Sequence, residues 1–275
     1  MNSLKSKFVL PFFTLIVGVG IYGIIGLFGE NPLGAVGMGL TAWGSWVFFG
    51  KVFITGAPRT SSNMPLVLAA AIVGVVLAVV EGTLLQVDLA VLCFFALLAY
   101  DFWYSRFGRK ESAALTIGNK LPTFVMEDAD GNEVTADNFK GAPAIFMFFR
   151  GNWCPLCMAQ IKEVADRYNE LETLGAKMVL VAPQSHKNTQ ELAERFKVNF
   201  TYLCDPENRA AKALGIEHLN GTPMGIAGYD ADTVLPTVIV VDADGTILMA
   251  DQTDNYRVRP EPDTFLNVLK EAAAV

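Results

Sequence analysis

Charged side chains are scarce in this chain of 275 residues. Only 18% of them are Asp, Glu, Lys or Arg, and 52% are hydrophobic, whereas soluble domains carry about 25% charged residues. Such an abundance of hydrophobic residues excludes a disordered chain. With only four cysteines over this length, a mini-domain held together by disulfides is excluded as well. The composition is too hydrophobic for one ordinary soluble domain.

Charge is nearly absent from residues 1–104. That part holds four basic and four acidic residues, namely Lys5, Lys7, Lys51, Arg59, Glu30, Glu81, Asp88 and Asp101. Residues 105–275 hold 17 of the 21 basic and 24 of the 28 acidic residues, and therefore the whole net charge of −7. Because phosphate binding needs clustered basic side chains, we expect no nucleic-acid partner. The sequence thus has two unlike parts.

The first part contains four apolar runs, each long enough or nearly long enough to cross a bilayer, whose core needs roughly 20 apolar helical residues. The first run is too long for the apolar core of a signal peptide, and the sequence after it, Gly29-Glu-Asn-Pro32, is a poor cleavage site. We therefore predict an all-α transmembrane region over residues 1–104, followed by a linker at 105–114. The predicted helices cover about 8–28, 33–50, 64–80 and 84–103.

Basic residues indicate the orientation of these helices. They lie in the N-terminal tail, in the loop 51–63 and just after the fourth run, where Arg106, Arg109 and Lys110 follow, whereas the other two loops have none. By the positive-inside rule, both termini are expected on the cytoplasmic side of a bacterial inner membrane, with the lipid bilayer as a partner. No helix has a charge at its centre, which favours an anchor over a proton or solute path.

Residues 115–275 have the pattern of an α/β domain. The continuous apolar run 144–149 is typical of a buried central strand, and turn signals such as Asp130-Gly131 and Asp244-Gly245 separate shorter runs. Strands alternating with helices predict a mixed sheet with helices on both faces. Further strands are expected at 178–182, 200–204, 237–241 and 246–250, and helices from Pro155 to Leu174, at 189–197, at 206–214 and at 263–274.

Trp153-Cys154-Pro155-Leu156-Cys157 carries the candidate chemistry. It follows the central strand, where a helix begins, and a helix N-terminus stabilises a thiolate there. Two cysteines at this spacing can form a small disulfide ring. A zinc site needs four ligands, and no second closely spaced pair of ligands exists, because Cys204, His186 and His218 are scattered. We expect a redox-active disulfide and neither a metal nor another cofactor.

The chain from about 115 to 270 resembles the alkyl hydroperoxide reductase/thiol-specific antioxidant family, which is peroxiredoxin-like and has a thioredoxin fold. The motifs that carry the resemblance are Gly118-Asn-Lys-Leu-Pro122-Thr-Phe124, Asp130-Gly131, Phe139-Lys-Gly141, Phe148-Phe-Arg-Gly-Asn-Trp-Cys154-Pro-Leu-Cys157, Leu203-Cys-Asp205-Pro, Leu214-Gly215-Ile and Val241-Asp242-Ala-Asp-Gly245. The resemblance implies an antioxidant oxidoreductase for this part of the chain.

Residue by residue, the motif can be compared with the peroxiredoxin pattern and with the thioredoxin pattern. On the peroxiredoxin pattern the peroxidatic cysteine falls on Cys157, but the family's proline, threonine and arginine fall on Arg150, Cys154 and Pro236. The thioredoxin pattern keeps all its positions: Trp153 and both cysteines are present, and Pro236 occupies the place of the cis-proline that faces the disulfide in thioredoxins. The resemblance therefore implies a cis bond before Pro236.

The first hypothesis is a membrane-anchored thiol–disulfide oxidoreductase in which Cys154 attacks and Cys157 resolves the mixed disulfide. Its substrate would be a disulfide-bearing protein or a small thiol or peroxide, and an external thioredoxin-type system would reduce it. Leu235, Pro236 and Thr237 would shape the docking surface, and Trp153 would shield one side. A thiol peroxidase with Cys157 or Cys154 as the peroxidatic residue, supported by Arg150, is an alternative, and a non-catalytic membrane redox sensor is another.

The remaining candidate residues are expected to have structural or surface roles, or to bind or pair with carboxylates. Cys204 at a strand end is expected to be buried and structural, Cys93 in the fourth helix inert, and His186 a surface residue. The segment Asn255-Tyr-Arg257-Val-Arg259-Pro-Glu-Pro262 also resembles this family. Its arginines are expected either to bind a carboxylate or to pair with Glu261, Asp263 or Asp254.

Overall fold

The computed structural model describes residues 2–224 and 226–273. Contacts divide the chain into two compact units, one covering Lys7–Phe107 and the other covering the chain from Gly108 onward together with the residues before Lys7. The division between Phe107 and Gly108 falls within the predicted linker. Each unit is described by itself.

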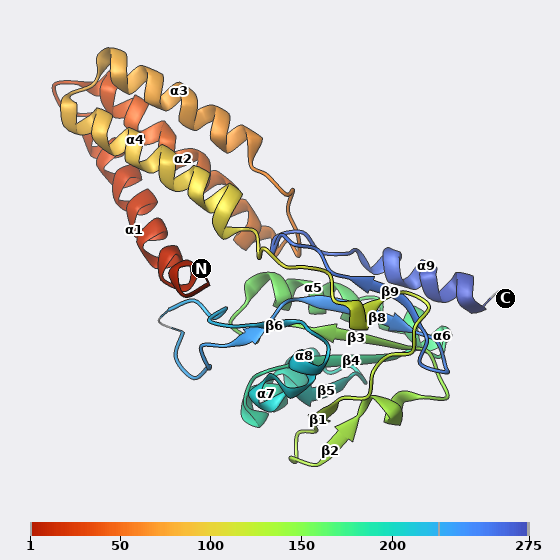
Figure 1. Ribbon diagram of the computed structural model, residues 1–275. Helices are drawn as coiled ribbons and strands as arrows, with labels where there is room; N and C mark the ends of the chain where they lie inside the picture. The colour runs from red at the N-terminus through yellow and green to blue at the C-terminus, as the bar shows by residue number, and fades with distance from the viewer. Residues whose placement is uncertain (1, 225, 274–275) are drawn as a thin grey trace. The chain divides into compact units, whose positions relative to one another are not determined.

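The first unit is helical. It contains α1 (Asn2–Gly26), α2 (Pro32–Thr55), α3 (Pro65–Glu81) and α4 (Leu84–Leu98), and α4 continues as a π-helical turn, η1 (Ala99–Tyr104). Three of the described helices, α1, α2 and α4 with η1, are long and apolar enough to cross a membrane, and α3 is a shorter apolar helix of 17 residues. Figure 1 shows the four helices in red to yellow.

Local sequence signals begin and end these helices. Pro32 occupies the first turn of α2 after Asn31, whose side chain accepts a hydrogen bond from the Gly34 amide at 3.2 Å. Thr83 and Gln86 form a reciprocal capping box at the start of α4. Short polar caps thus divide an otherwise continuous apolar sequence.

Small residues allow the helices to approach closely. A Cβ atom at Gly37 would lie 2.4 Å from the backbone nitrogen of Ala78, so that α2 and α3 meet backbone to backbone. The Trp43 indole donates a hydrogen bond to the Gly20 carbonyl at 3.0 Å and joins α2 to α1. The helical unit is therefore closely packed.

The second unit is built on a seven-stranded mixed sheet in the order β2-β1-β5-β4-β3-β8-β9. Strands β3, β4 and β5 are parallel, β8 and β9 continue the sheet antiparallel on one side, and β1 and β2 do so on the other. The strands are β1 (Val125–Glu127), β2 (Glu133–Thr135), β3 (Ala144–Phe148), β4 (Lys177–Ala182), β5 (Thr201–Cys204), β8 (Thr237–Val241) and β9 (Ile247–Asp251). A separate two-stranded sheet pairs β6 (Glu217–His218) with β7 (Thr233–Val234). Every residue of β3 is buried, as the apolar run predicts.

Helices cover this sheet. They are α5 (Pro155–Ala165), α6 (Tyr168–Thr173), α7 (His186–Phe196), α8 (Arg209–Ala213) and α9 (Pro262–Ala273), with short 3-10 turns η2 (Ala113–Leu115), η3 (Ala136–Phe139) and η4 (Pro206–Asn208). Helix α7 packs against β5, α8 against β1, and α9 against β8 and β9 (Figure 1). The predicted thioredoxin-like mixed sheet with helices is confirmed.

Two predicted helices are interrupted. The helix expected from Pro155 to Leu174 divides at Arg167, whose backbone leaves the helical region (φ −105°, ψ 16°) and whose side chain pairs with Glu170 and Asp263. The helix expected at 206–214 divides where Glu207 and Asn208 take φ values of 57° and 56°. After the second break, the Asp205 carboxylate accepts hydrogen bonds from the amides of Ala210 and Ala211 in the first turn of α8.

Candidate functional site

The two cysteines of the Trp-Cys-x-x-Cys motif lie where β3 leads into α5. Cys154 is the N-cap of α5 and Pro155 occupies its first turn, so Cys157 lies in that first turn as well. Before them, Gly151 has φ +134°, and a Cβ atom there would lie 2.9 Å from both Trp153 and Tyr229. Glycine is therefore required to bring the chain into the helix.

Both thiols are free and buried, Cys154 with 3% and Cys157 with 1% of its surface exposed. A hydrogen bond joins them and separates their pKa values. That bond, followed by burial, raises the pKa of Cys154. Burial acts to raise the pKa of Cys157 too, but the bond from Cys154, the Arg259 charge and the Arg150 backbone amide together lower it to about 6. The pair thus shares one negative charge, located on Cys157.

Arg259 is the guanidinium that contacts the sulfur. Its Nη2 lies 3.8 Å from the Sγ of Cys157. It reaches the site from the segment between β9 and α9 and is 6% exposed. The sequence singled out the segment around it but offered only carboxylate partners, so this contact was missed. The resemblance of the segment to the family was the available signal.

Arg150, expected as electrostatic support, is also at the site. Its backbone amide hydrogen bonds to Cys157, its side chain donates to the Gly221 carbonyl, and its guanidinium stacks over the Trp153 ring at 4.6 Å. Its charge therefore acts on the cysteines at longer range than that of Arg259.

Trp153 lies beside the dithiol, as predicted from its place in the motif. Its ring meets that of Tyr229 edge to face, with the centroids 6.5 Å apart. Tyr229 comes from the loop between β6 and β7, and burial raises the pKa of its hydroxyl. No motif in the sequence indicates that this tyrosine belongs to the site.

Leu235, Pro236 and Thr237 are buried at the start of β8. The expectation of a cis bond before Pro236 is wrong, since no peptide bond among the described residues is cis. A trans X–Pro bond is the form favoured intrinsically, by about 0.5–1 kcal/mol. The Arg109 side chain donates to the Pro236 carbonyl at 3.1 Å and to the Thr237 hydroxyl at 3.2 Å. A docking role for these residues stays a prediction.

The other candidates lie apart from the dithiol. Cys204 ends β5, buried, with its Sγ 3.2 Å from the Thr189 hydroxyl, which fits a structural role. His186 is partly exposed at the start of α7 and lies 3.1 Å from a Glu127 carboxylate oxygen. Within the described part of the chain, no three His, Cys, Asp or Glu side chains gather where a metal ion could be held.

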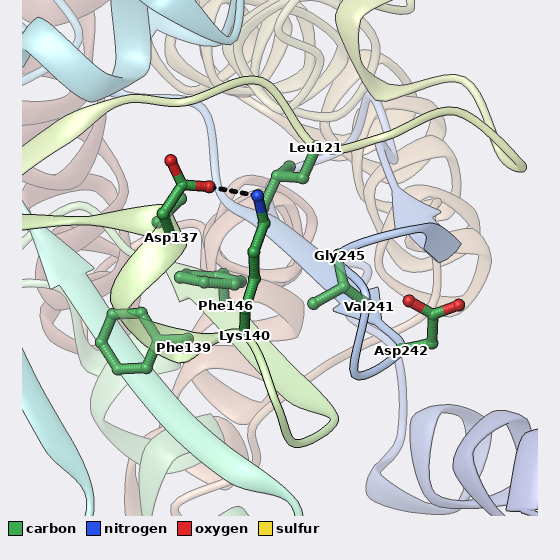
Figure 2. Close-up of a pocket in the computed structure, with 9 residues that line it drawn as sticks. Leu121, Asp137, Phe139, Lys140, Phe146, Val241, Asp242 and Gly245 are labelled. Atoms are coloured by element: carbon green, nitrogen blue, oxygen red, sulfur yellow. Dashed lines mark ion pairs between the residues drawn. The ribbon is translucent and has the colours of Figure 1, made fainter.

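One small pocket lies at the opposite end of the sheet, beside the start of β3. This pocket has a volume of about 10 Å³ and lies between η3 and the loop after β8. The side chains of Asp137 and Lys140, paired at 2.6 Å, lie beside it (Figure 2). Such a volume accommodates about one water molecule. Val241, which lines it, pairs with Ala144 at the start of β3, whereas the cysteines follow the end of that strand. This pocket is too small for a substrate.

Comparisons with known proteins give a consistent result for this unit. The model of the AhpC/TSA family matches residues 117–250. The chloroplastic peroxiredoxin Q of Sedum lineare is 32% identical over 127 residues, which cover 45% of this chain and 68% of that protein. The peroxiredoxin Bcp of Escherichia coli is 26% identical over 159 residues, covering 58% of this chain and 98% of that protein.

A solved structure agrees at the level of the fold. A mutant of the peroxiredoxin 6 of Arenicola marina superposes with a TM-score of 0.50 at 13% identity, covering 57% of this chain and 73% of that chain. The family match begins after the helical unit.

Proposed function

The chain belongs to the AhpC/TSA family, and from this membership we propose that it is a thiol-dependent peroxidase in which Cys157 attacks a hydroperoxide and Cys154 resolves the product. It is an oxidoreductase that works through thiols, as its peroxiredoxin relatives are. The observation that carries the proposal is the Arg259 contact on Cys157, the residue at the family's peroxidatic position. This order of roles reverses the first hypothesis drawn from the sequence.

The proposed reaction has two steps on the protein. The Cys157 thiolate attacks the terminal peroxide oxygen, the O–O bond breaks, and the alkoxide or hydroxide takes up a proton and leaves as an alcohol or water. Cys157 is then a sulfenic acid. The Cys154 thiolate attacks its sulfur, the S–S bond forms, and the hydroxyl group leaves as water. An external dithiol supplies the two electrons that reduce the disulfide again.

Burial favours a small oxidant. With 1% of Cys157 and 3% of Cys154 exposed, a peroxide can approach more easily than a disulfide held in a folded protein. A thiol–disulfide oxidoreductase remains the second candidate, because the thioredoxin-like motif from Trp153 to Cys157 is intact.

A substrate comparison separates these functions. The full chain, purified in detergent micelles, is pre-reduced and mixed with hydrogen peroxide, an alkyl hydroperoxide or a protein disulfide. We expect both hydroperoxides to oxidise the dithiol at least about tenfold faster than the protein disulfide. Faster reaction with the protein disulfide would establish the second candidate instead. No turnover of any of the three substrates with excess external dithiol, in a chain whose thiols are undamaged at the start, would favour the redox sensor.

We also propose that the helical unit anchors the enzyme in a bacterial inner membrane with the redox unit on the cytoplasmic side. The apolar lengths of α1, α2 and α4 with η1 support the anchor. The orientation is supported by Lys5 and Lys7 near the start of α1, by Lys51 near the end of α2 and by Arg59 in the loop after it. A reporter fused after residue 275 is expected to be active in the cytoplasm and to sediment with membranes. A reporter active only outside the cytoplasm would reverse the orientation, and one in the soluble fraction would remove the anchor.

A further inference from the structure

We propose that Arg259 is the residue whose charge serves both steps of the reaction, first by holding the thiolate of Cys157 and then, once Cys157 is oxidised, by favouring the thiolate of Cys154. The inference rests on the proposed function and adds to it a residue outside the motif. On the peroxiredoxin pattern, the position of the family's arginine is occupied here by Pro236, so the charge must come from elsewhere in the chain.

Contact geometry distinguishes Arg259 from the other arginine of the site. Arg259 points its Nη2 at the sulfur, at 3.8 Å, and is buried. The Arg150 guanidinium is directed to the Gly221 carbonyl and to the Trp153 ring instead. A charge-assisted hydrogen bond in a buried site is stronger than one in water. Of these two guanidiniums, that of Arg259 therefore contributes more to the thiolate of Cys157.

Several charged and titratable groups surround the two sulfurs. Cys154 lies on the same helix turn, Arg150 on the preceding loop and Arg259 on the segment before α9, while Arg109 and His218 act on these arginines from further away. Burial, followed by the Arg150 charge, lowers the pKa of His218 to about 3, so this histidine is neutral at physiological pH. The cations that act on the two cysteines are Arg259 and Arg150, and the charge of an arginine does not change between pH 5 and 9.

The order of the two steps follows from the shared charge. While Cys157 is a thiolate, its negative charge and its hydrogen bond keep Cys154 protonated. Conversion of Cys157 to a neutral sulfenic acid removes that charge, but Arg259 and Arg150 remain, and both already act on Cys154. Deprotonation of Cys154 then becomes easier than before, at the step in which Cys154 attacks. The resolving thiol is activated only after the peroxide has reacted.

The test measures the pH dependence of Cys157 alkylation by iodoacetamide in the full chain, followed by mass spectrometry. Because only the thiolate reacts, labelling falls as the pH drops through the pKa of Cys157, near 6 in the unmodified chain. Arg259→Gln is expected to move this midpoint upward by at least about one pH unit. It should also slow formation of the Cys154–Cys157 disulfide after peroxide at least about tenfold. Arg259→Lys should restore part of each, with a midpoint between those of the unmodified chain and of Arg259→Gln. Arg195→Gln, at an exposed position on α7, is the matched control.

A folded Arg259→Gln chain with an unmoved midpoint would overturn the inference. If that variant does not fold, Arg259→Met, which is neutral and of similar reach, takes its place under the same criterion. If neither neutral variant folds, Arg259→Lys is decisive, because its single ammonium should raise the midpoint measurably and an unchanged midpoint would refute the role. A moved midpoint in a chain that consumes no peroxide would leave the charge role standing and refute the proposed function. Peroxide consumption that needs Cys157 but not Arg259 would support the proposed function and refute the role of Arg259.

Discussion

Replacing Cys157 by serine is expected to lower peroxide consumption by about 10³-fold or more, to the background rate. Removal of a nucleophile commonly costs this much, because the remaining groups cannot form the covalent intermediate. In this chain no other thiol takes over, because Cys157 is the cysteine whose sulfur the Arg259 guanidinium contacts. Stopped-flow measurement of peroxide loss, with the full chain in detergent and excess dithiol, provides the number.

Cys204→Ser is the matched control for this variant. It removes another buried thiol, whose sulfur contacts Thr189 and lies apart from the dithiol, and it should leave the rate within about twofold. The opposite pattern, in which Cys157→Ser retains the rate and Cys154→Ser loses it, would reinstate Cys154 as the attacking residue.

Replacing Cys154 by serine should separate the first turnover from the later ones. Cys157 keeps its contact with Arg259, so one equivalent of peroxide is still consumed rapidly. The sulfenic acid then has no resolving thiol beside it and is oxidised further to sulfinic acid. We expect multiple-turnover activity to fall by at least about 10²-fold and intact-mass spectra to show the sulfinic form of Cys157.

The unmodified chain, treated with the same peroxide, is the comparison. It should accumulate the disulfide and little sulfinic acid, because the two thiols are already joined by a hydrogen bond. Sustained turnover in Cys154→Ser would mean that an external thiol resolves the sulfenic acid directly, and the role of Cys154 would then have to be abandoned.

Local patterns in the sequence were sufficient to predict most of the fold. The apolar run that became β3 is continuous because both faces of that strand are covered. The breaks at Arg167 and Asn208 could not be predicted in this way. The first depends on Asp263 in α9, and the second on the Asp205 carboxylate, which accepts hydrogen bonds from the amides of Ala210 and Ala211. The spacing of apolar residues along the chain carries no information about such partners.

The candidate site, too, could be predicted only in part. The pair Cys154 and Cys157 could be recognised from the sequence, because two cysteines three positions apart at the start of a helix lie close together. The contact of Arg259 with Cys157 spans 102 positions, and neither charge nor composition indicates which of several buried arginines faces a sulfur. The trans bond before Pro236 was mispredicted because a sequence likeness to thioredoxins transfers a residue without its local conformation.

The hydrogen bonds of Arg109 affect which molecules are expected to exchange electrons with the enzyme. By binding the Pro236 carbonyl and the Thr237 hydroxyl, it occupies backbone and side-chain groups that an incoming polypeptide would otherwise use for pairing. On the predicted docking role of these residues, a protein disulfide has to displace this guanidinium first, whereas a peroxide does not. The proposed function therefore predicts that the dithiol exchanges electrons more slowly with the disulfides of neighbouring proteins than with small peroxides.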